Sequence, residues 1–139
     1  MPDIKKINHV AVIVENIDSA LSFWRDQLGL NLDHIEEVPS QASKVAFLPV
    51  GEGEVELVQP TDPDSGLAKY LEKRGEGMHH LCIEVDDIQA MLENLKEKNV
   101  RLINEEPAVL PGRKMAFIHP KSTNGVLIEL YELTDLENE

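Results

Sequence analysis

Apolar and polar residues alternate in the same way along two separated stretches of this chain. In the first stretch, three valines fall on one face of a predicted strand, and His9 and Ala11 fall on the other. In the second stretch, large aliphatic residues share one face, opposite His80 and Cys82. The aliphatic faces are expected to pack under helices, and the small residues beside the histidines are typical of the floor of a cavity.

Each of these strands leads into a helix and then into three shorter strands. Helical periodicity begins after Asn16 or Asp18 in the first copy and after Asp86 or Asp87 in the second. Turn residues separate the β-type runs that follow. The predicted strands are residues 7–14, 30–38, 43–50 and 54–59 in the first copy and 79–85, 100–103, 114–119 and 126–132 in the second, with a short helix over 67–74 between the copies. The pattern therefore predicts an α+β fold of two β-α-β-β-β modules in one chain.

The repeats run over about residues 5–60 and 76–133 of a chain of 139 residues. A half of that size could bury little apolar surface by itself, whereas the whole chain is long enough for a real core. We therefore expect a single domain over residues 1–139.

The charge of the chain narrows the choice of partners. The formal net charge is -13, which argues against nucleic acid and anionic membranes as partners, because both attract clustered Lys and Arg. The single cysteine excludes an intrachain disulfide, the first residues given lack the apolar core typical of a signal peptide, and no apolar stretch here reaches membrane-spanning length. A soluble cytoplasmic protein is expected.

The two copies also repeat a pair of metal-ligand residues. Glu56 follows His9 by 47 residues, and Glu129 follows His80 by 49. In both copies the period of two places the glutamate away from the helix layer, on the same kind of face as the histidine. The repeat therefore predicts that these four side chains form one site for a divalent metal ion.

Two imidazoles and two carboxylates suit a first-row ion such as Co²⁺, Zn²⁺, Ni²⁺ or Mn²⁺, with coordination positions left open for oxygen ligands. The other histidines are not assigned to the metal. His79 falls on the strand face opposite to that of His80, His34 lies in an acidic strand and His119 precedes a proline. Cys82 is expected to serve packing.

The chain resembles the vicinal oxygen chelate (glyoxalase/bleomycin resistance-like) superfamily, and within it methylmalonyl-CoA epimerase. The resemblance covers nearly the whole chain and rests on residues 8–12, 77–88, 119–122 and 125–130. It implies an open, cupped mixed sheet of two modules around a divalent metal. It also implies the ligands His9, Glu56, His80 and Glu129, in agreement with the repeat.

The resemblance implies a reaction as well as a fold. The metal would stabilise the enolate formed when a carbon acid next to a CoA thioester loses its proton, and reprotonation on the other face would invert the centre. Glu129 is the expected base. Many bacterial epimerases that the chain resembles carry a glutamate in the strand after the Pro39 turn, where this chain has Val45, so a second proton-transfer residue is not identified. Lys114 and Lys121, with Arg113, are candidate contacts for the CoA phosphates, and a homodimer is implied.

Two other functions fit the same residues. One is a glyoxalase I-like lyase acting on a glutathione hemithioacetal through a metal-stabilised enediolate. The other is a non-catalytic module that binds a small molecule, which the presence of all four ligands disfavours. Turnover of the two substrates would separate the enzymes, and metal analysis would separate either enzyme from the binding module.

Overall fold

The computed structural model describes residues 2–135, which divide into two compact units. One unit combines the N-terminal residues up to Asn8 with the chain from His80 onward, and the other is His9–His79. The division falls inside strand β1 (Ile4–Ile13) and strand β5 (Gly77–Val85), which are the first strands of the two modules. The two units are described separately below.

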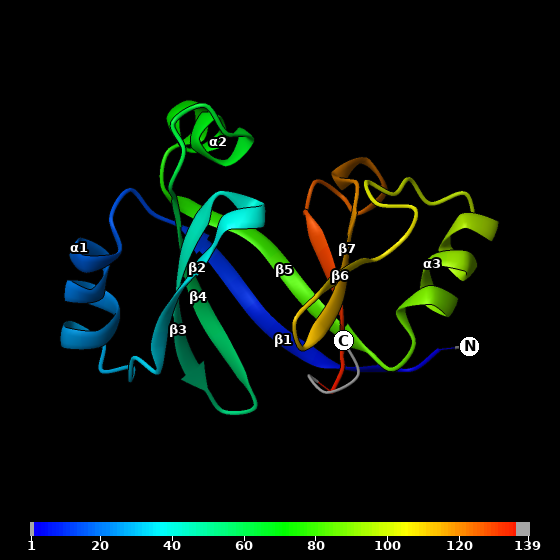
Figure 1. Cartoon of the computed structure of the whole chain (residues 1–139), viewed down its shortest axis with the longest axis horizontal. Helices are drawn as coiled ribbons and strands as arrows, with labels where there is room; N and C mark the ends of the chain where they lie inside the picture. Colours follow the sequence, from blue (N-terminus) through cyan, green and yellow to red (C-terminus); the bar gives the residue numbers. More distant parts are fainter. Residues whose placement is uncertain (1, 136–139) are drawn as a thin grey trace. The chain divides into compact units, whose positions relative to one another are not determined.

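The His9–His79 unit combines β-strands with helices (Figure 1). After β1 its elements are α1 (Ile17–Leu21), a π-helical turn (Ser22–Gln27), β2 (His34–Val38), a 3-10 turn (Pro39–Gln41), β3 (Ser43–Val50), β4 (Gly53–Pro60) and α2 (Gly66–Arg74). The strand order is β2-β3-β4-β1. β1 is parallel to β4, and the other neighbours are antiparallel.

Helix α1 covers one face of this sheet. Asn16 caps the helix by accepting a hydrogen bond from the Ser19 N–H at 2.9 Å. Ile17 and Leu21 then pack on alternate residues of the strands, among them Leu57. The strand residues of the other parity, including His9 and Glu56, therefore lie on the face that α1 does not cover.

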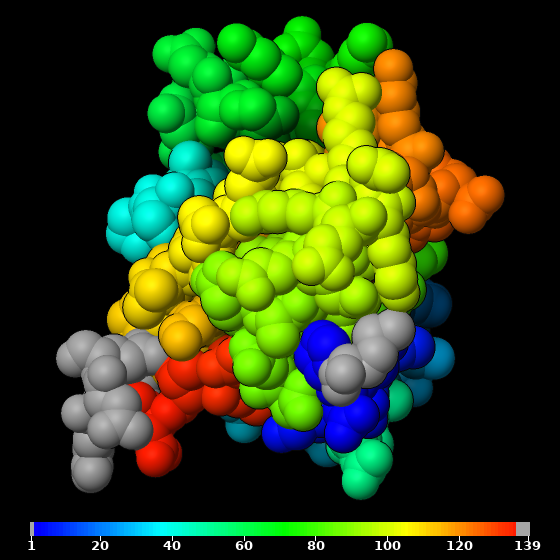
Figure 2. Space-filling model, turned by 90° about the vertical axis from the view of Figure 1, so that its right-hand side faces the viewer, coloured from blue at the N-terminus to red at the C-terminus, as the bar shows by residue number. Residues whose placement is uncertain are grey.

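The second unit repeats this architecture. Its elements are β5, α3 (Ile88–Glu97), β6 (Ala108–Leu110), β7 (Arg113–Ile118), a 3-10 turn (Pro120–Ser122) and β8 (Ile128–Leu133), in the strand order β5-β8-β7-β6. Asp87 caps α3 through the Ala90 N–H at 3.0 Å. Figure 2 shows α3 on the outer surface of this unit, and its inner side packs Ile88 and Leu92 against the sheet.

The predicted α+β class with two β-α-β-β-β modules is confirmed, but several elements differ from the prediction. The strand predicted over residues 30–38 begins only at His34. The strand predicted over residues 100–103 is wrong, because only Leu102 forms an isolated bridge, to Ile118. The edge strand is β6 instead, which pairs with β7 across a turn at Gly112. The first predicted helix continues beyond Leu21 as a π-helical turn. Among the described residues, no helix is both long and apolar enough to span a bilayer.

Candidate functional site

A buried histidine and a buried glutamate meet in the His9–His79 unit. His9 is 1% exposed and Glu56 6% exposed, and Nδ1 of His9 lies 2.9 Å from Oε2 of Glu56. β1 and β4 run parallel, with Ala11 beside Glu56 in the register. The pair therefore occupies the face opposite α1, where the alternation of the two strands predicts it.

The second unit contains the matching pair. Nε2 of His80 lies 3.0 Å from Oε1 of Glu129, and Glu129 is 3% exposed. β5 and β8 are also parallel, with Cys82 beside Glu129. The predicted duplication of histidine and glutamate is thus present as one close pair in each unit.

Small side chains lie next to both glutamates, as the sequence predicts. Ala11 and Cys82 are fully buried and occupy equivalent places, each beside the glutamate of its module. A larger residue there would crowd the carboxylate. The Sγ of Cys82 lies within 4.8 Å of a carboxylate oxygen of Glu129, so the packing role predicted for this cysteine stays a prediction.

A phenylalanine stands opposite each glutamate, and the prediction from sequence missed this second repeat. Phe47 pairs with Glu56 across β3 and β4, and Phe117 pairs with Glu129 across β7 and β8. The ring of Phe117 also meets His80 edge-on, with 5.6 Å between centroids. The signal was available, because both phenylalanines follow a lysine by three residues in a shared Lys-X-Ala-Phe pattern. Each close pair is therefore bordered by an aromatic wall.

Glu54 is a further carboxylate on the same face of β4. It lies opposite His9 in the register, two residues before Glu56. Partial burial, and then the negative charge of Glu56, raise the pKa of Glu54 to about 7. Near neutral pH this carboxyl group is therefore partly protonated.

The donor atoms of each pair fit a first-row divalent ion. Two ligand atoms bound at about 2.1 Å and at a right angle lie about 3.0 Å apart. The separations of 2.9 Å and 3.0 Å match neighbouring positions of one coordination sphere. The same separation suits a hydrogen bond between imidazole and carboxylate, which holds each pair in the geometry that an ion needs.

The two candidate lysines occupy different environments. Lys114 pairs with Glu132 in the register, and its Nζ lies 3.9 Å from Oε2 of Glu132. Glu132 also accepts a hydrogen bond from the Ile88 N–H at the start of α3, so Lys114 lies on the helix side of the sheet. Lys121 is exposed in the 3-10 turn. Contact of either lysine with a substrate remains a prediction.

Arg113 lies on the other side of the same sheet. It precedes Phe117 by four residues on β7 and so shares its face with Phe117 and Glu129. Its guanidinium carbon is 5.7 Å from the centre of the Tyr131 ring. Of the two adjacent cations of β7, Arg113 is the one on the glutamate face.

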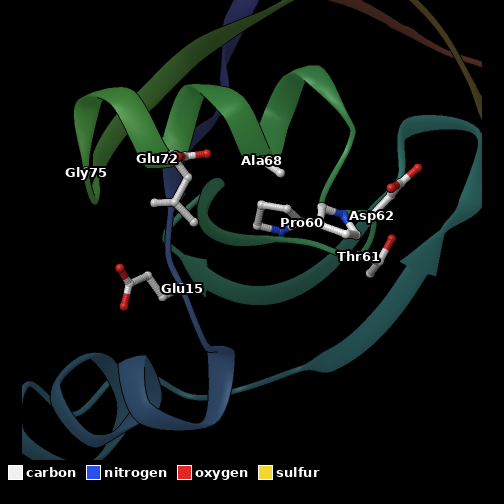
Figure 3. Close-up of a pocket in the computed structure, with 9 residues that line it drawn as sticks. Glu15, Pro60, Thr61, Asp62, Ala68, Glu72 and Gly75 are labelled. Atoms are coloured by element: carbon white, nitrogen blue, oxygen red, sulfur yellow. The ribbon is translucent and has the colours of Figure 1, made fainter.

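A separate hollow of about 590 Å³ lies between the end of β4 and α2 (Figure 3). The carboxylates of Glu15, Asp62 and Glu72 are on its wall, and neither His9 nor Glu56 lines it. Three carboxylates repel an anionic ligand. This hollow is therefore unsuited to an acyl-CoA and separate from the histidine–glutamate pair of its unit.

Comparison with known proteins identifies the family. The profile of the Glyoxalase/Bleomycin resistance protein/Dioxygenase superfamily matches residues 8–117, and the chain belongs to this superfamily. Within it the chain is similar to methylmalonyl-CoA epimerases. The family and the isomerase class predicted from the sequence are thus confirmed.

Three relatives illustrate the similarity. The mitochondrial methylmalonyl-CoA epimerase of Mus musculus is 39% identical over 127 residues, covering 90% of this chain and 71% of that protein. An ethylmalonyl-CoA/methylmalonyl-CoA epimerase of Cereibacter sphaeroides is 35% identical over 133 residues, covering 94% and 99%. The structure of a methylmalonyl-CoA epimerase in complex with methylmalonyl-CoA and NH4+ matches with a TM-score of 0.88 at 30% identity, covering 96% and 98%. The similarity extends over both modules.

Proposed function

We propose that this protein is a metal-dependent epimerase of 2-substituted malonyl-CoA thioesters. The observation that carries the proposal is the duplicated, buried histidine–glutamate pair, whose separations of 2.9 Å and 3.0 Å suit metal ligands. The similarity to methylmalonyl-CoA epimerases over 90% or more of the chain supports the substrate class.

In this proposal His9, Glu56, His80 and Glu129 hold a single divalent ion. The ion would supply Lewis acidity, which lowers the energy of the enolate of the thioester. Co²⁺, Zn²⁺, Ni²⁺ and Mn²⁺ all accept imidazole and carboxylate ligands, so the donor set is compatible with each of them.

Glu129 is the proposed base of the reaction. Its carboxylate would take the proton from the carbon between the thioester and the carboxylate of the substrate, and the electron pair of the C–H bond would move into the thioester carbonyl. Burial of Glu129 keeps bulk water from competing for that proton. Phe117 lies opposite Glu129 on the neighbouring strand and adds an apolar wall to the proposed site.

Lys114 and Lys121 are the proposed contacts for the phosphates of CoA. The exposed position of Lys121 supports its role, while the ion pair of Lys114 with Glu132 has to open before Lys114 can contribute. We also propose a homodimer in the cytoplasm, where the single cysteine would remain reduced.

The decisive experiment is proton exchange at the substrate. Protein loaded separately with each of the four ions is incubated with one enantiomer of methylmalonyl-CoA in D2O, and loss of the α-proton and inversion are followed by NMR and chiral separation. Both are expected with at least one ion and are expected to stop after chelation. Formation of lactoylglutathione from the glutathione hemithioacetal, without epimerisation, would favour the glyoxalase I-like lyase. A metal-free protein that turns over neither substrate would favour the binding module.

A further inference from the structure

A segment without acidic residues lies near two exposed cations in the second unit. Residues 107–128 contain no aspartate or glutamate, although the whole chain has 26 of them. The segment includes the 3-10 turn Pro120–Ser122, in which Lys121 is exposed, and Arg101 is exposed in the loop that follows α3. An anion therefore meets little local repulsion at this turn, in spite of the negative charge of the chain.

Backbone hydrogen bonds hold Arg101 beside His119. Leu102 forms an antiparallel bridge with Ile118, so Arg101 and His119 are the next pair in that register. The N–H of His119 donates to the Arg101 carbonyl at 2.9 Å, and the N–H of Arg101 donates to Oγ of Ser122 at 2.9 Å. Opposite residues of antiparallel strands have their Cβ atoms about 5 Å apart on the same face. The side chains of Arg101 and His119 therefore leave the backbone on the same side.

Lys121 completes this group of three side chains, the Arg101–His119–Lys121 cluster. The Lys121 N–H donates to Nδ1 of His119 at 3.0 Å, so the neutral imidazole carries its proton on Nε2 and can donate it to an acceptor. Desolvation, and then the charges of Arg101 and Lys121, lower the pKa of His119. Both cations are thus close enough to the ring for their charges to act on it.

Neither cation of the cluster is engaged by a carboxylate. Within residues 2–135, no aspartate or glutamate forms an ion pair with Arg101 or Lys121. Lys114 differs, because its Nζ lies 3.9 Å from Oε2 of Glu132. An anion can therefore bind Arg101 and Lys121 without first displacing a carboxylate of the described chain.

The cluster lies on the same face as Glu129. Phe117 is opposite Glu129 in the register of β7 and β8. His119 follows Phe117 by two residues, and its backbone is still extended, so both side chains point to the same face. Two residues of a strand span about 6.6 Å. A thioester whose acyl group reaches Glu129 therefore has an anion-binding cluster farther along this face.

We propose that the Arg101–His119–Lys121 cluster binds the phosphate groups of CoA. The inference rests on the proposed function for the identity of the anion, and it adds Arg101 and His119 to the residues that recognise the substrate. The planar guanidinium of Arg101 can donate two hydrogen bonds to one phosphate, Lys121 supplies a positive charge, and Nε2 of His119 supplies a neutral N–H donor. These groups contribute to affinity, because the phosphates are remote from the carbon that is inverted.

Arg113 is the alternative cation on this face of the sheet. It begins β7, at the opposite end of the strand from the cluster. Its Nη1 donates to the Pro111 carbonyl at 3.3 Å, and its guanidinium lies over the Tyr131 ring. These contacts hold Arg113 against its own strand pair, whereas Arg101 is exposed in a loop. Arg113→Gln is therefore the competing variant in the test.

The test uses metal-loaded protein and three methylmalonyl thioesters. They are those of CoA, of dephospho-CoA, which lacks the 3′-phosphate, and of pantetheine, which lacks all phosphates. Arg101→Gln should raise KM for the CoA thioester by about 10-fold with kcat unchanged, and should leave the kinetics of the pantetheine thioester unchanged. Arg101→Lys should have a smaller effect, since it keeps the charge but not the paired donors. An effect shared by dephospho-CoA assigns Arg101 to the diphosphate, and an effect confined to CoA assigns it to the 3′-phosphate.

The matched control is Lys96→Gln. It also removes one positive charge from the second unit, but Lys96 is on α3 and lies 3.6 Å from Glu106. Its KM for the CoA thioester should equal that of the wild type. An increase as large as that of Arg101→Gln would overturn the inference, because only the net charge of the protein would then matter.

A binding measurement gives a readout that does not need turnover. Desulfo-CoA lacks the thiol that could bind the ion, so it is titrated into Zn²⁺-loaded protein and followed by NMR. The ring signals of His119 should shift, whereas sodium chloride at equal ionic strength should leave them unchanged. The Kd of desulfo-CoA should rise about 10-fold in Arg101→Gln.

The remaining outcomes separate this inference from the proposed function. Unchanged KM and Kd in Arg101→Gln, an equal rise of KM for the pantetheine thioester, or a larger rise in Arg113→Gln would overturn the inference and leave the epimerase proposal intact. If the wild type inverts none of the thioesters but binds desulfo-CoA in a manner that depends on Arg101, the proposed function fails and the phosphate site stands.

Discussion

Burial of His9 and Glu129 is costly unless their polar atoms are satisfied, because an unpaired polar or charged group inside a protein loses its hydration. Each of them has a close polar partner within its own unit, Glu56 for His9 and His80 for Glu129. Both histidines and both glutamates are thus placed by the strands but stabilised by each other. Removal of one member leaves the other without that partner.

Replacement of either histidine should remove the metal while the fold is retained. His9→Ala and His80→Ala each delete one of four proposed ligands, and the aliphatic cores on the helix sides of the sheets are not touched. We expect metal content after dialysis against a weak chelator to fall well below that of the wild type, with an unchanged far-UV CD spectrum. The control is His79→Ala, which should keep its metal. Full occupancy in either ligand variant would show that the assignment is wrong.

Glu129→Gln should separate chemistry from metal binding. The amide oxygen can still coordinate an ion, but the amide cannot accept a proton near neutral pH. We expect α-proton exchange to fall by about 100-fold or more, with a modest loss of metal. Glu56→Gln at equal metal loading should be milder. Undiminished exchange in Glu129→Gln would remove this residue from the mechanism.

His119 should titrate below the ordinary pKa of a histidine. Its Nδ1 accepts a hydrogen bond from the Lys121 N–H at 3.0 Å, which only the unprotonated nitrogen can do. Desolvation, and then the charges of Arg101 and Lys121, lower the pKa of His119. The contribution of this residue to folding stability is therefore present above the ordinary pKa and is lost as the pH falls. NMR titration of the imidazole should give a pKa below that of the unfolded chain, and Arg101→Gln should raise it; an elevated value would contradict this contact.

Among the elements, helix α3 illustrates how a short amphipathic segment is stabilised. Its ten residues would be marginal in isolation. Asp87 satisfies an N–H at the first turn, and Ile88, Met91 and Leu92 bury one side of the helix on the sheet. Tertiary packing therefore provides most of its stability.

Leu92→Ala tests this packing. The side chain is fully buried, so its truncation should lower the free energy of unfolding by about 2–5 kcal/mol through lost burial and a residual cavity. Urea denaturation of the metal-free protein gives the measurement. Glu97→Ala, at an exposed position of the same helix, should change stability by less than about 0.5 kcal/mol. Similar values for the two variants would contradict the assigned core.

For the whole molecule, the proposals concern the number of ions and of chains. If all four ligands hold one ion, calorimetric titration should give one ion per chain. Two ions per chain would assign each histidine–glutamate pair its own ion and overturn the shared site. If the four ligands share one ion, His9→Ala should weaken the binding of that ion. The variant should not bind half as many ions as the wild type with unchanged affinity.

The proposed homodimer is tested independently of the metal. Sedimentation equilibrium of the wild type should give twice the chain mass of 15.6 kDa, both with and without a chelator, because no ligand in the proposed site comes from a second chain. Dissociation on removal of the metal would indicate that a second chain contributes a ligand. A monomer under all conditions would overturn the dimer.

The sequence by itself determined which face of each strand the site residues occupy. Successive side chains of an extended chain point to opposite faces, and this alternation depends only on the local backbone. The faces of His9 and Glu56, and of His80 and Glu129, therefore follow from their aliphatic neighbours in the sequence. The repeat further indicated that both modules carry the same pair. The helix starts were likewise predicted, at Asn16 or Asp18 and at Asp86 or Asp87, because capping depends on residues close in sequence, and the caps of the structure are Asn16 and Asp87.

Only the tertiary structure decided which strands pair and in which register. The predicted strand over residues 100–103 was wrong, because in this segment only Leu102 pairs with the sheet, through an isolated bridge to Ile118. The edge strand is β6, which pairs with β7. The row of His34, Phe47 and Glu56 joins three strands of the His9–His79 unit, and its register depends on strand pairing that the local pattern of residues does not determine. The distances within each histidine–glutamate pair have the same origin, since hydrogen bonding between strands brings together residues 47 and 49 positions apart.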